Sequence, residues 1–377
     1  MDFELNESQR AARAQFREFV DEYVAPFAAE FDRDERIPRE LIEKLGQCGY
    51  LGALAPVEYG GQGMDALTWG LLCEEFGRGS ASLLSLLTVH SMVIQALIKW
   101  GDDEQHDSWL PRLATGEVIA AFGLSEPDVG SDAANCQTTA RTDGESYVLN
   151  GEKRWISFGQ VADVFLVFGN IDGHSAAFLV ESNSAGFDRE PISGMSGFRS
   201  AMLAMLHLNN CQIPSGNLVG RPGFGFSHVG GTALDHGRFC IAWGALGLMQ
   251  GCIDASLDYT SNRQQFGALL KEHQIIKAMI ADMYVQAKAA RLMCTNAAHL
   301  KERGDPSLLM ETSIAKYFSS QAAVKIALDA VQLHGANGCT EDFPVARYLR
   351  DAKIFEIIEG SNQIQQIIIA RYGYQNQ

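Results

Sequence analysis

The stretch that decides the fold lies near the C-terminus and reads Arg350-Asp351-Ala352-Lys353-Ile354-Phe355-Glu356-Ile357-Ile358-Glu359-Gly360-Ser361-Asn362-Gln363-Ile364-Gln365. It places one carboxylate, Glu359, between a pair of isoleucines and a Gly-Ser step. Apolar neighbours disfavour the charged form of a carboxyl group and raise its pKa, which suits a general base that removes a proton from carbon near neutral pH. On the residue alone, the simpler interpretation is a helix that ends at Gly360 and leaves Glu359 solvated in its last turn.

Composition limits the class of protein. The chain has 377 residues, 46% of them hydrophobic, so we expect two or three packed domains rather than one core. Its 30 Lys and Arg residues against 46 Asp and Glu give a formal net charge of −16, and no strongly basic run offsets it. Because such a surface repels nucleic acid and anionic lipid, we expect neither as a partner.

The cysteines and the N-terminus bear on location. The eight cysteines contain no Cys-x-x-Cys pair, which is typical of small buried side chains in a reducing compartment. The first residues, Met1–Leu5, are acidic and lack the basic and apolar segments of a signal peptide. No uncharged apolar run reaches about 18 residues, the length of a membrane span. We therefore expect a cytoplasmic protein with no membrane partner.

The spacing of apolar residues divides the chain into three parts. Steps of three and four residues between Glu7 and Phe31 indicate an amphipathic helix. Short β-branched or alternating segments in the middle of the chain indicate a small antiparallel barrel or sandwich. Ala-rich periodic segments follow and predict a helical bundle. The predicted fold class is α+β, with an N-terminal α-helical domain at 1–117, a middle β domain at 118–226 and a C-terminal helical bundle at 227–377.

Individual elements follow from the same patterns. After the first helix we expect helices at 39–46, 67–78 and 82–100, and then an acidic loop at 101–107. The expected strands are 118–124, 146–149, 164–167, 176–180 and 204–208. The expected helices of the bundle are 234–262, 273–303 and 305–329, with a shorter terminal segment.

The C-terminal stretch resembles the signature of the acyl-CoA dehydrogenase family, whose catalytic base falls on the position of Glu359. The loop Pro56–Gly61 also resembles that family, and the order of helices, strands and helices matches its architecture over essentially the whole sequence. The resemblance implies an enzyme that oxidises an acyl thioester with FAD as its cofactor. Glu359 would remove the α-proton while a hydride leaves the neighbouring carbon. The thioester carbonyl would be polarised by hydrogen bonds, one of them from the backbone N–H of Glu359.

The first flavin element is Ala121–Asp132, an apolar segment followed by Ser-Glu-Pro-Asp-Val-Gly-Ser-Asp. By itself it is a strand and a turn that can present backbone N–H groups and a hydroxyl to a flat ring. It resembles the family's flavin loop, although the family more often has Thr at the position of Ser125. The resemblance implies that Phe122, Leu124, Ser125, Gly130 and Ser131 contact the cofactor, with Ser131 nearer the substrate's tail.

The second flavin element is Asn150–Ser157, which reads Asn-Gly-Glu-Lys-Arg-Trp-Ile-Ser. The Asn-Gly step alone predicts a tight hairpin turn, and Trp155 alone is typical of a half-buried strand. The segment also resembles a family motif in which the Trp ring packs on the flavin and a hydroxyl two residues later bonds to it. Trp155 and Ser157 would take those roles here.

The third element begins at Arg263 in the run Asn262–Gly267. An arginine at a helix end is ordinarily a solvated cap, yet a guanidinium also gives bidentate recognition of a pyrophosphate. The run resembles the family segment that binds the adenine half of FAD held by a neighbouring subunit. A shared site implies a homotetramer, a dimer of dimers. The cofactor residues implied here are Arg263, Phe266, Gln274, Gln332 and Gly335, with Ser361 and Gln363 after the base.

Other motifs are weak. Gly223-Phe224-Gly225-Phe226 lacks the third glycine and the preceding strand of a dinucleotide fingerprint. The nine histidines form no His-Glu-x-x-His motif and no Cys/His pairing, so we expect no metal site. His90 lies on a helix expected to face the acyl pocket and is a candidate for substrate contact.

The thioester carrier is the remaining question. In Gly197–Leu208, Met and Leu replace the Ser-x-Thr typical of enzymes that use CoA, and Gly223–Arg238 resembles family members from polyketide and peptide antibiotic pathways. Asp235 and Arg238 match the family's Asp-x-x-Arg and are expected to bind substrate on either carrier. We expect an acyl group tethered to a carrier protein, with free acyl-CoA as the alternative and an unidentified electron acceptor. A flavin oxidase of the same fold is a rival. Candidates for a basic docking patch are Arg199, Arg221, Arg238 and Lys271.

Overall fold

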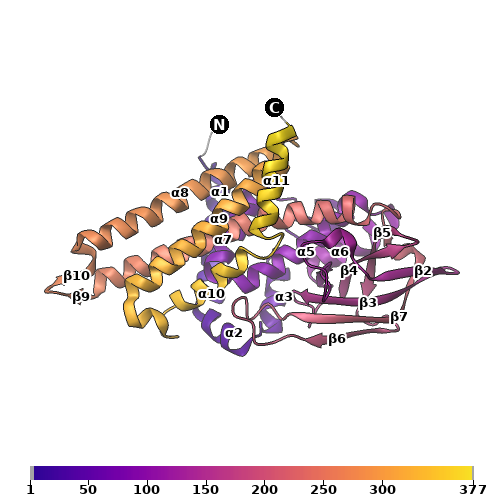
Figure 1. The fold of residues 1–377 in the computed structure, drawn as a ribbon, viewed down its shortest axis with the longest axis horizontal. Coiled ribbons are helices and arrows are strands. Elements are labelled where there is room, and N and C mark those ends of the chain that lie inside the picture. Colours follow the sequence, from indigo (N-terminus) through magenta and orange to yellow (C-terminus); the bar gives the residue numbers. More distant parts are fainter. Residues whose placement is uncertain (1–3, 376–377) are drawn as a thin grey trace.

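The computed structural model describes residues 4–375, so the first residues of the acidic N-terminal segment lie outside it. A β-sheet lies at one end of the molecule and the long C-terminal helices extend to the other (Figure 1). The N-terminal helices contact both parts, because α4 and α5 pack on α7 and α5 also packs on β1. The N-terminal helices are α1 (Glu7–Tyr23), α2 (Ala28–Asp34), α3 (Arg39–Gln47), α4 (Ala66–Gly79), α5 (Ala81–Trp100) and α6 (Asp103–Thr115).

Two N-terminal expectations are wrong. The helix predicted over 7–31 ends at Tyr23, and a 3-10 turn containing Pro26 separates it from α2, since proline cannot donate the helical hydrogen bond. The acidic segment 101–107 is not a loop but contains the start of α6. There the Asp102 side chain accepts a bond from the Gln105 backbone N–H, and the Gln105 side chain accepts one from the Asp102 backbone. This capping box starts the helix where the negative charges favour it.

The middle part is one mixed sheet of eight strands in the order β6-β7-β3-β2-β4-β5-β8, with β1 paired to β4. Within residues 4–375 this path does not close into a barrel. The sheet is also not wholly antiparallel, because β1 and β2 both run parallel to β4. The strands are β1 (Ala120–Gly123), β2 (Thr139–Asp143), β3 (Ser146–Ile156), β4 (Val164–Ile171), β5 (His174–Glu181), β6 (Phe187–Pro191), β7 (Ala204–Pro214) and β8 (Leu218–Val219).

The step Asn150-Gly151 is not the predicted hairpin turn. It lies inside β3, where the pairing with β7 shifts register between Leu149 and Gly151. The turn into β3 is instead at Gly144, whose φ is +62°. A side chain at Gly151 would meet the hydroxyl oxygen of Thr138 at 2.5 Å, so a glycine is needed at this bulge.

The C-terminal part is built around α7. This helix packs on α4, α5, α8, α9 and α10, and it meets α4 very closely because a Cβ at Gly247 would lie 1.9 Å from the backbone oxygen of Glu74. A short hairpin follows α7 and projects at the end of the molecule opposite the sheet (Figure 1). The elements are α7 (Gly231–Asn262), β9 (Gln264–Gln265), β10 (Ala268–Leu269), α8 (Gln274–Glu302), α9 (Leu308–His334), α10 (Val345–Phe355) and α11 (Asn362–Gln375).

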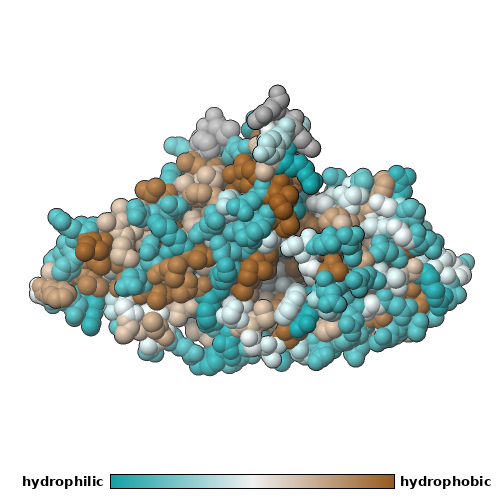
Figure 2. All heavy atoms as spheres, in the orientation of Figure 1, coloured by the Kyte–Doolittle hydropathy of each residue, from teal (hydrophilic) through white to brown (hydrophobic). Residues whose placement is uncertain are grey.

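Two apolar segments, Ala81–Trp100 and Gly225–Asn262, are long and apolar enough to cross a membrane, which corrects the statement that no such run exists. Their apolar windows are 89% and 78% buried inside the fold, so they are core helices. Exposed apolar side chains gather instead over the half of the molecule that holds α8 and α9 (Figure 2). Those of α8 are Ile275, Tyr284, Val285 and Leu292, and those of α9 are Leu309 and Leu328.

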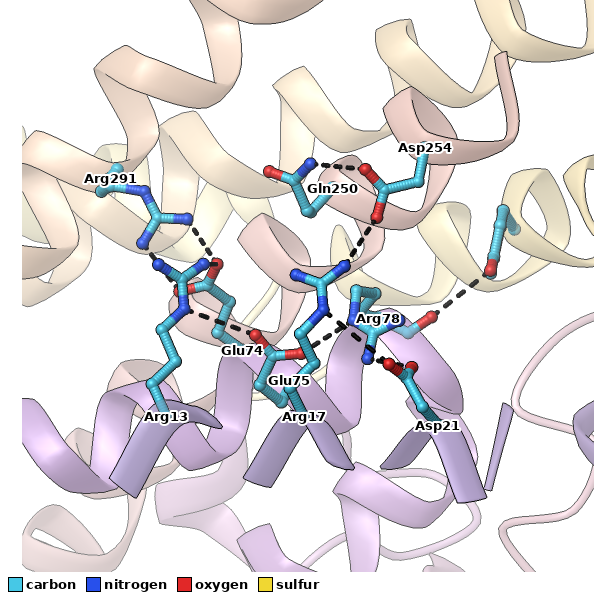
Figure 3. A network of polar contacts seen from close by, with 10 residues as sticks. Arg13, Arg17, Asp21, Glu74, Glu75, Arg78, Gln250, Asp254 and Arg291 are labelled. Carbon is cyan, nitrogen blue, oxygen red and sulfur yellow. Dashed lines mark hydrogen bonds and ion pairs between the residues drawn. The ribbon is translucent and has the colours of Figure 1, made fainter. Parts of the chain in front are cut away.

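A buried ionic network joins α1 to the C-terminal bundle through α4 (Figure 3). Glu74 is almost fully buried and is bonded by Arg13 of α1, at 3.0 Å, and by Arg291 of α8. Glu75 is bonded by Arg78 at 2.8 Å, and Arg78 also reaches Asp21 of α1 at 2.6 Å. Each buried carboxylate therefore has a guanidinium partner, which offsets the cost of removing it from water.

Candidate active site

Glu359 lies in the turn between α10 and α11. The helix α10 ends at Phe355, so the simpler interpretation of a helix running to Gly360 is wrong. Glu359 has a φ of +54° and Gly360 a φ of +81°, which places a non-glycine residue in the left-handed region. The residue keeps some exposed surface, but its Oε2 is buried and has no hydrogen-bond partner among residues 4–375. Such strain and such an orphaned atom occur where a site is built for function.

The carboxylate of Glu359 rests on α7. A Cβ at Gly237 would lie 2.2 Å from its Oε2 and 3.0 Å from the sulfur of Met92, so only glycine leaves room for the base. Burial raises the pKa of Glu359 from 4.5 to about 7, against the lowering effect of the Arg238 and Lys316 cations. The group therefore changes charge near neutral pH, as a base for a carbon acid requires.

Residues behind the turn fix its path. Lys316 of α9 donates from Nζ to the backbone oxygen of Gly360 at 2.9 Å and to Oδ1 of Asn362 at 3.1 Å. Gln365 donates to the backbone oxygens of Glu359, at 3.1 Å, and Gly360, at 2.8 Å. Sequence reasoning missed all three residues. One signal was available, since Lys316 is the one charged residue in the run Ser-Ile-Ala-Lys-Tyr-Phe.

The first two flavin elements meet at one end of β3. The backbone N–H of Arg154 donates to the backbone oxygen of Ser125 at 2.9 Å, which joins the loop after β1 to the end of β3. Trp155 is 46% exposed with a φ of +65°, and the guanidinium of Arg154 lies 4.5 Å from its ring centre. Phe122 and Leu124 are buried beneath, Ser157 is half-buried, and Gly130 and Ser131 are exposed in the turn that follows Ser125.

A buried ion pair that sequence reasoning left without a role supports this loop. Lys153 Nζ lies 2.7 Å from Oε1 of Glu126 and also donates to the backbone oxygen of Leu124 at 3.2 Å. Glu126 further accepts bonds from the backbone N–H groups of Gln137 and Thr138. These bonds hold the pKa of Glu126 below its usual range although burial opposes them. Glu126 belongs to the first flavin element and Lys153 to the second, so both residues were quoted from the sequence and only their pairing was missed.

The third element, which begins at Arg263, lies away from the first two. Phe266 is 97% exposed in the hairpin β9–β10, and Arg263, Gln274, Gln332 and Gly335 are exposed as well. The two sequence segments concerned share one end of the bundle, where the ring of Tyr259 stacks on His334 with centres 4.3 Å apart. Figure 1 shows this end opposite the sheet, so one chain does not bring Arg263 to Trp155.

His90 has a structural position rather than the expected substrate contact. Its Nδ1 accepts a bond from the backbone N–H of Ala120 at 3.1 Å, so its Nε2 donates to the backbone oxygen of Leu113 at 3.0 Å. Both ring nitrogens are used in tying α5 to α6 and β1, and burial lowers the pKa of His90 to about 4. By contrast, Asp235 Oδ1 and Arg238 Nε are buried without a partner within residues 4–375, and the charge of Arg238 acts on the base.

The exposed groups fit a large flavin nucleotide. Trp155 offers an open aromatic face, and the Nε of Arg154 beside it is buried with no partner in the part of the chain that the structure describes. Arg263 offers an exposed guanidinium suited to a pyrophosphate, and Phe266 an exposed ring. The chain thus has an exposed aromatic ring in the sheet and an exposed guanidinium beside the hairpin β9–β10.

Comparison with known proteins gives matches along the whole chain. Three family models match, described as the acyl-CoA dehydrogenase N-terminal domain (residues 6–117), middle domain (121–211) and C-terminal domain (223–373). The probable acyl-CoA dehydrogenase FadE25 of Mycobacterium tuberculosis is 38% identical over 98% of this chain and 96% of its own. The short-chain specific acyl-CoA dehydrogenase of Clostridium acetobutylicum is 37% identical over 98% and 99%.

Solved structures agree with these matches. Butyryl-CoA dehydrogenase from Megasphaera elsdenii superposes with a TM-score of 0.95 at 33% identity, covering 99% of each chain. The prolyl acyl carrier protein oxidase AnaB superposes with 0.93 at 28% identity, covering 98% of this chain and 99% of its own. FkbI, described as serving biosynthesis of the methoxymalonyl extender unit of a polyketide, superposes with 0.89 at 31% identity, covering 96% and 99%.

Proposed function

Because this chain belongs to the acyl-CoA dehydrogenase family, whose cofactor is FAD, we propose that it oxidises an acyl thioester with Glu359 as the catalytic base. The observation that carries the proposal is the buried Oε2 of Glu359, which has no hydrogen-bond partner among residues 4–375 and belongs to a carboxyl group whose pKa burial raises to about 7. A surface carboxylate would stay ionised throughout the neutral range and would be too weak a base for this step.

The backbone around the base contributes a second group. In the part of the chain that the structure describes, the backbone N–H of Glu359 donates no hydrogen bond, so it is free to bind the thioester carbonyl. A donor aimed at that oxygen stabilises the negative charge that develops when the α-proton leaves for the Glu359 carboxylate. FAD, when bound, supplies the acceptor for the hydride of the neighbouring carbon.

The proposal includes roles for the other predicted residues. Phe122, Leu124, Ser125, Gly130, Ser131, Trp155 and Ser157 would hold the flavin half of FAD, and Ser361 and Gln363 would contact it after the base. Asp235 and Arg238 would bind the substrate from α7, where each has a buried polar atom with no partner in the described part of the chain.

A homotetramer follows from the division of the site. The hairpin β9–β10 lies at the end of the molecule opposite the sheet that contains Trp155 (Figure 1). We therefore propose that a second copy brings the third element to the cofactor, with its residues Arg263, Phe266, Gln274, Gln332 and Gly335. The exposed apolar side chains of α8 and α9 supply a surface for that contact (Figure 2). Their burial in an assembly would remove these apolar side chains from water.

Acyl-CoA is the first candidate substrate, since both relatives named above are called acyl-CoA dehydrogenases. The basic patch expected for carrier-protein docking is not formed. Arg199 pairs with Glu35 at 2.9 Å, Arg238 turns inward beside Asp235 and Glu359, and Arg221 and Lys271 lie on separate parts of the fold.

A carrier-tethered acyl group remains a second candidate for a specific reason. Met202 and Leu203, which replace the family's hydroxyl residues, are buried and offer no donor to a pantetheine arm. AnaB and FkbI, which share the fold, have names that refer to a carrier protein and to polyketide biosynthesis. The proposed location is the cytoplasm.

Anaerobic addition of thioesters to the purified holoenzyme tests the proposal. The flavin absorption band should bleach with an acyl-CoA, and it should not bleach in the variant Glu359→Gln. Failure of every acyl-CoA and every acyl carrier protein to bleach the wild-type flavin would reject the proposed reaction. The same acyl group presented on CoA and on a phosphopantetheinylated carrier protein separates the two candidates by rate, and rapid oxygen consumption by the reduced protein would identify an oxidase.

A further inference from the structure

Lys316 is a fully buried lysine directly beneath the turn that carries the base. It belongs to α9, 43 positions before Glu359 in the sequence, and its side chain has 0% relative exposure. Nζ donates to the backbone oxygen of Gly360 at 2.9 Å and to Oδ1 of Asn362 at 3.1 Å. A buried ammonium is costly unless its hydrogens are bonded and a negative charge is near, so this placement calls for an explanation.

The turn that Lys316 holds is strained. Glu359 adopts a left-handed backbone with a φ of +54°, which costs free energy in a residue with a side chain. Neutral groups already bond the same turn, because Ser320 donates to Oδ1 of Asn362 at 2.8 Å and Gln365 donates to the backbone oxygens of Glu359 and Gly360. Lys316 therefore adds something that these groups lack, which is a positive charge.

The ionisable groups that act on the base come from two helices, α7 and α9. Arg238 of α7 and Lys316 of α9 both lower the pKa of Glu359, whereas Cys240 of α7 raises it. Burial lowers the pKa of Lys316 to about 7, while Glu359 and Glu356 favour its charged form and Arg238 disfavours it. The lysine and the base thus stabilise each other's charged forms in a region that water does not screen.

We propose that Lys316 is a positioning residue for Glu359: it fixes the strained turn through Gly360 and Asn362 and supplies the cation that favours the carboxylate of the base. The inference rests on the proposed function of Glu359. It adds that proton abstraction depends on a cation on α9 that does not itself touch the substrate.

The variants Lys316→Met and Ser320→Ala test the inference as a matched pair. Each removes one donor to Oδ1 of Asn362, but only the first removes a charge, together with the bond to Gly360. The pH midpoint of Glu359 is followed in the holoenzyme by infrared spectroscopy, as the protonated-carboxyl band that Glu359→Gln abolishes. The rate of anaerobic flavin reduction by an acyl-CoA is measured over the same pH range.

Lys316→Met should move both midpoints to higher pH by roughly one unit, because one of two nearby cations is lost. With a midpoint near 7 in the wild type, flavin reduction at pH 7 should then fall about fivefold through ionisation alone. Ser320→Ala should leave both midpoints in place. Unmoved midpoints in Lys316→Met, with FAD bound, would overturn the inference.

The test still gives an answer if Lys316→Met does not fold or if no thioester reduces the flavin. If Lys316→Met does not fold, Lys316→Gln is measured instead, since its amide can still donate to Gly360, and an unmoved midpoint in that variant overturns the inference equally. If no thioester reduces the wild-type flavin, the proposed function fails, yet the infrared midpoint still decides whether Lys316 controls the charge of Glu359.

Discussion

Replacing Glu359 by glutamine should stabilise the protein at pH 8 while abolishing its activity. The amide keeps the shape of the carboxyl group but carries no charge, so it is not penalised for lying in the buried site against Gly237. In the wild type the native state disfavours the carboxylate, and stability is therefore lost as pH rises from the unfolded pKa towards the folded one. Turnover should fall by about three orders of magnitude, since an amide cannot accept the proton.

The magnitude follows from the pKa of Glu359. Burial raises it from 4.5 to about 7, a difference of about 2.5 pH units, which at 1.36 kcal/mol per unit corresponds to about 3 kcal/mol. The penalty is complete above about pH 7 and small at pH 5, where the native carboxyl group is protonated. Lys316, with a pKa of about 7, is mostly neutral at pH 8 in both proteins, so its own contribution cancels there.

The assay compares melting temperatures of wild-type and Glu359→Gln holoenzymes at pH 8 and pH 5, each at equal FAD occupancy. The variant should melt a few degrees higher at pH 8, and the advantage should vanish at pH 5. At pH 5 the carboxyl group of Glu359 is neutral in the wild type as well, so neither protein has an anion beside Lys316 and the contrast with pH 8 reports the cost of the charge. An equal difference at both pH values would refute the argument that the carboxylate is buried at a cost.

Three other changes test the cofactor site and the fold. Arg263→Ala should release FAD on gel filtration, because the pyrophosphate of the FAD held by a partner subunit loses its guanidinium. The control Arg303→Ala, also at an exposed end of a long helix, should retain FAD. Full FAD in both variants would contradict the shared site. Trp155→Ala should raise the dissociation constant of FAD at least tenfold, because the exposed ring is lost, and flavin fluorescence measures that constant. An unaltered dissociation constant would exclude packing of the Trp155 ring on the flavin. Lys153→Met should destabilise the protein by roughly 3–5 kcal/mol, because it leaves the buried carboxylate of Glu126 without its ion-pair partner. The control Lys325→Met, on the surface, should change the melting temperature little. Equal melting temperatures of the two variants would refute the role of the ion pair. Light scattering should show a tetramer, and a monomer with full FAD would contradict it.

The sequence predicted most long helices and the core of the sheet because their patterns are local. Apolar residues at helical spacing are enough to identify α4 or α7, and β-branched runs are enough for β4 and β5. Secondary structure was mispredicted where one cap or one pairing of strands decides the conformation rather than the local composition. Asp102 and Gln105 turn an apparently acidic loop into the start of α6, and Asn150-Gly151 forms a bulge because β7 pairs on both sides of it.

The candidate site was predicted through a family resemblance, which assigns roles to residues but does not say which residues contact them. Arg350 and Asp351 of the deciding stretch prove to be structural. Arg350 pairs with Asp32 at 2.5 Å, and Asp351 accepts a bond from the backbone N–H of Phe198 at 2.7 Å. They tie α10, which leads into the turn that bears Glu359, to α2 and to the segment between β6 and β7. Neither partner can be found from the sequence, because each lies more than 100 positions away in the chain.

The raised pKa of Glu359 was expected from the sequence, but for an incomplete reason. The adjacent isoleucines suggested an apolar environment, yet Ile357 is 55% exposed and shields little. Burial comes instead from Gly237 and Met92, which belong to helices distant in sequence, and the opposing charges come from Arg238 and Lys316. The turn supplies the base, α7 removes it from water and two cations limit how far its pKa rises. The basicity of Glu359 is therefore a property of the packed fold, and changes at Gly237 or Lys316 should alter it as surely as changes at Glu359 itself.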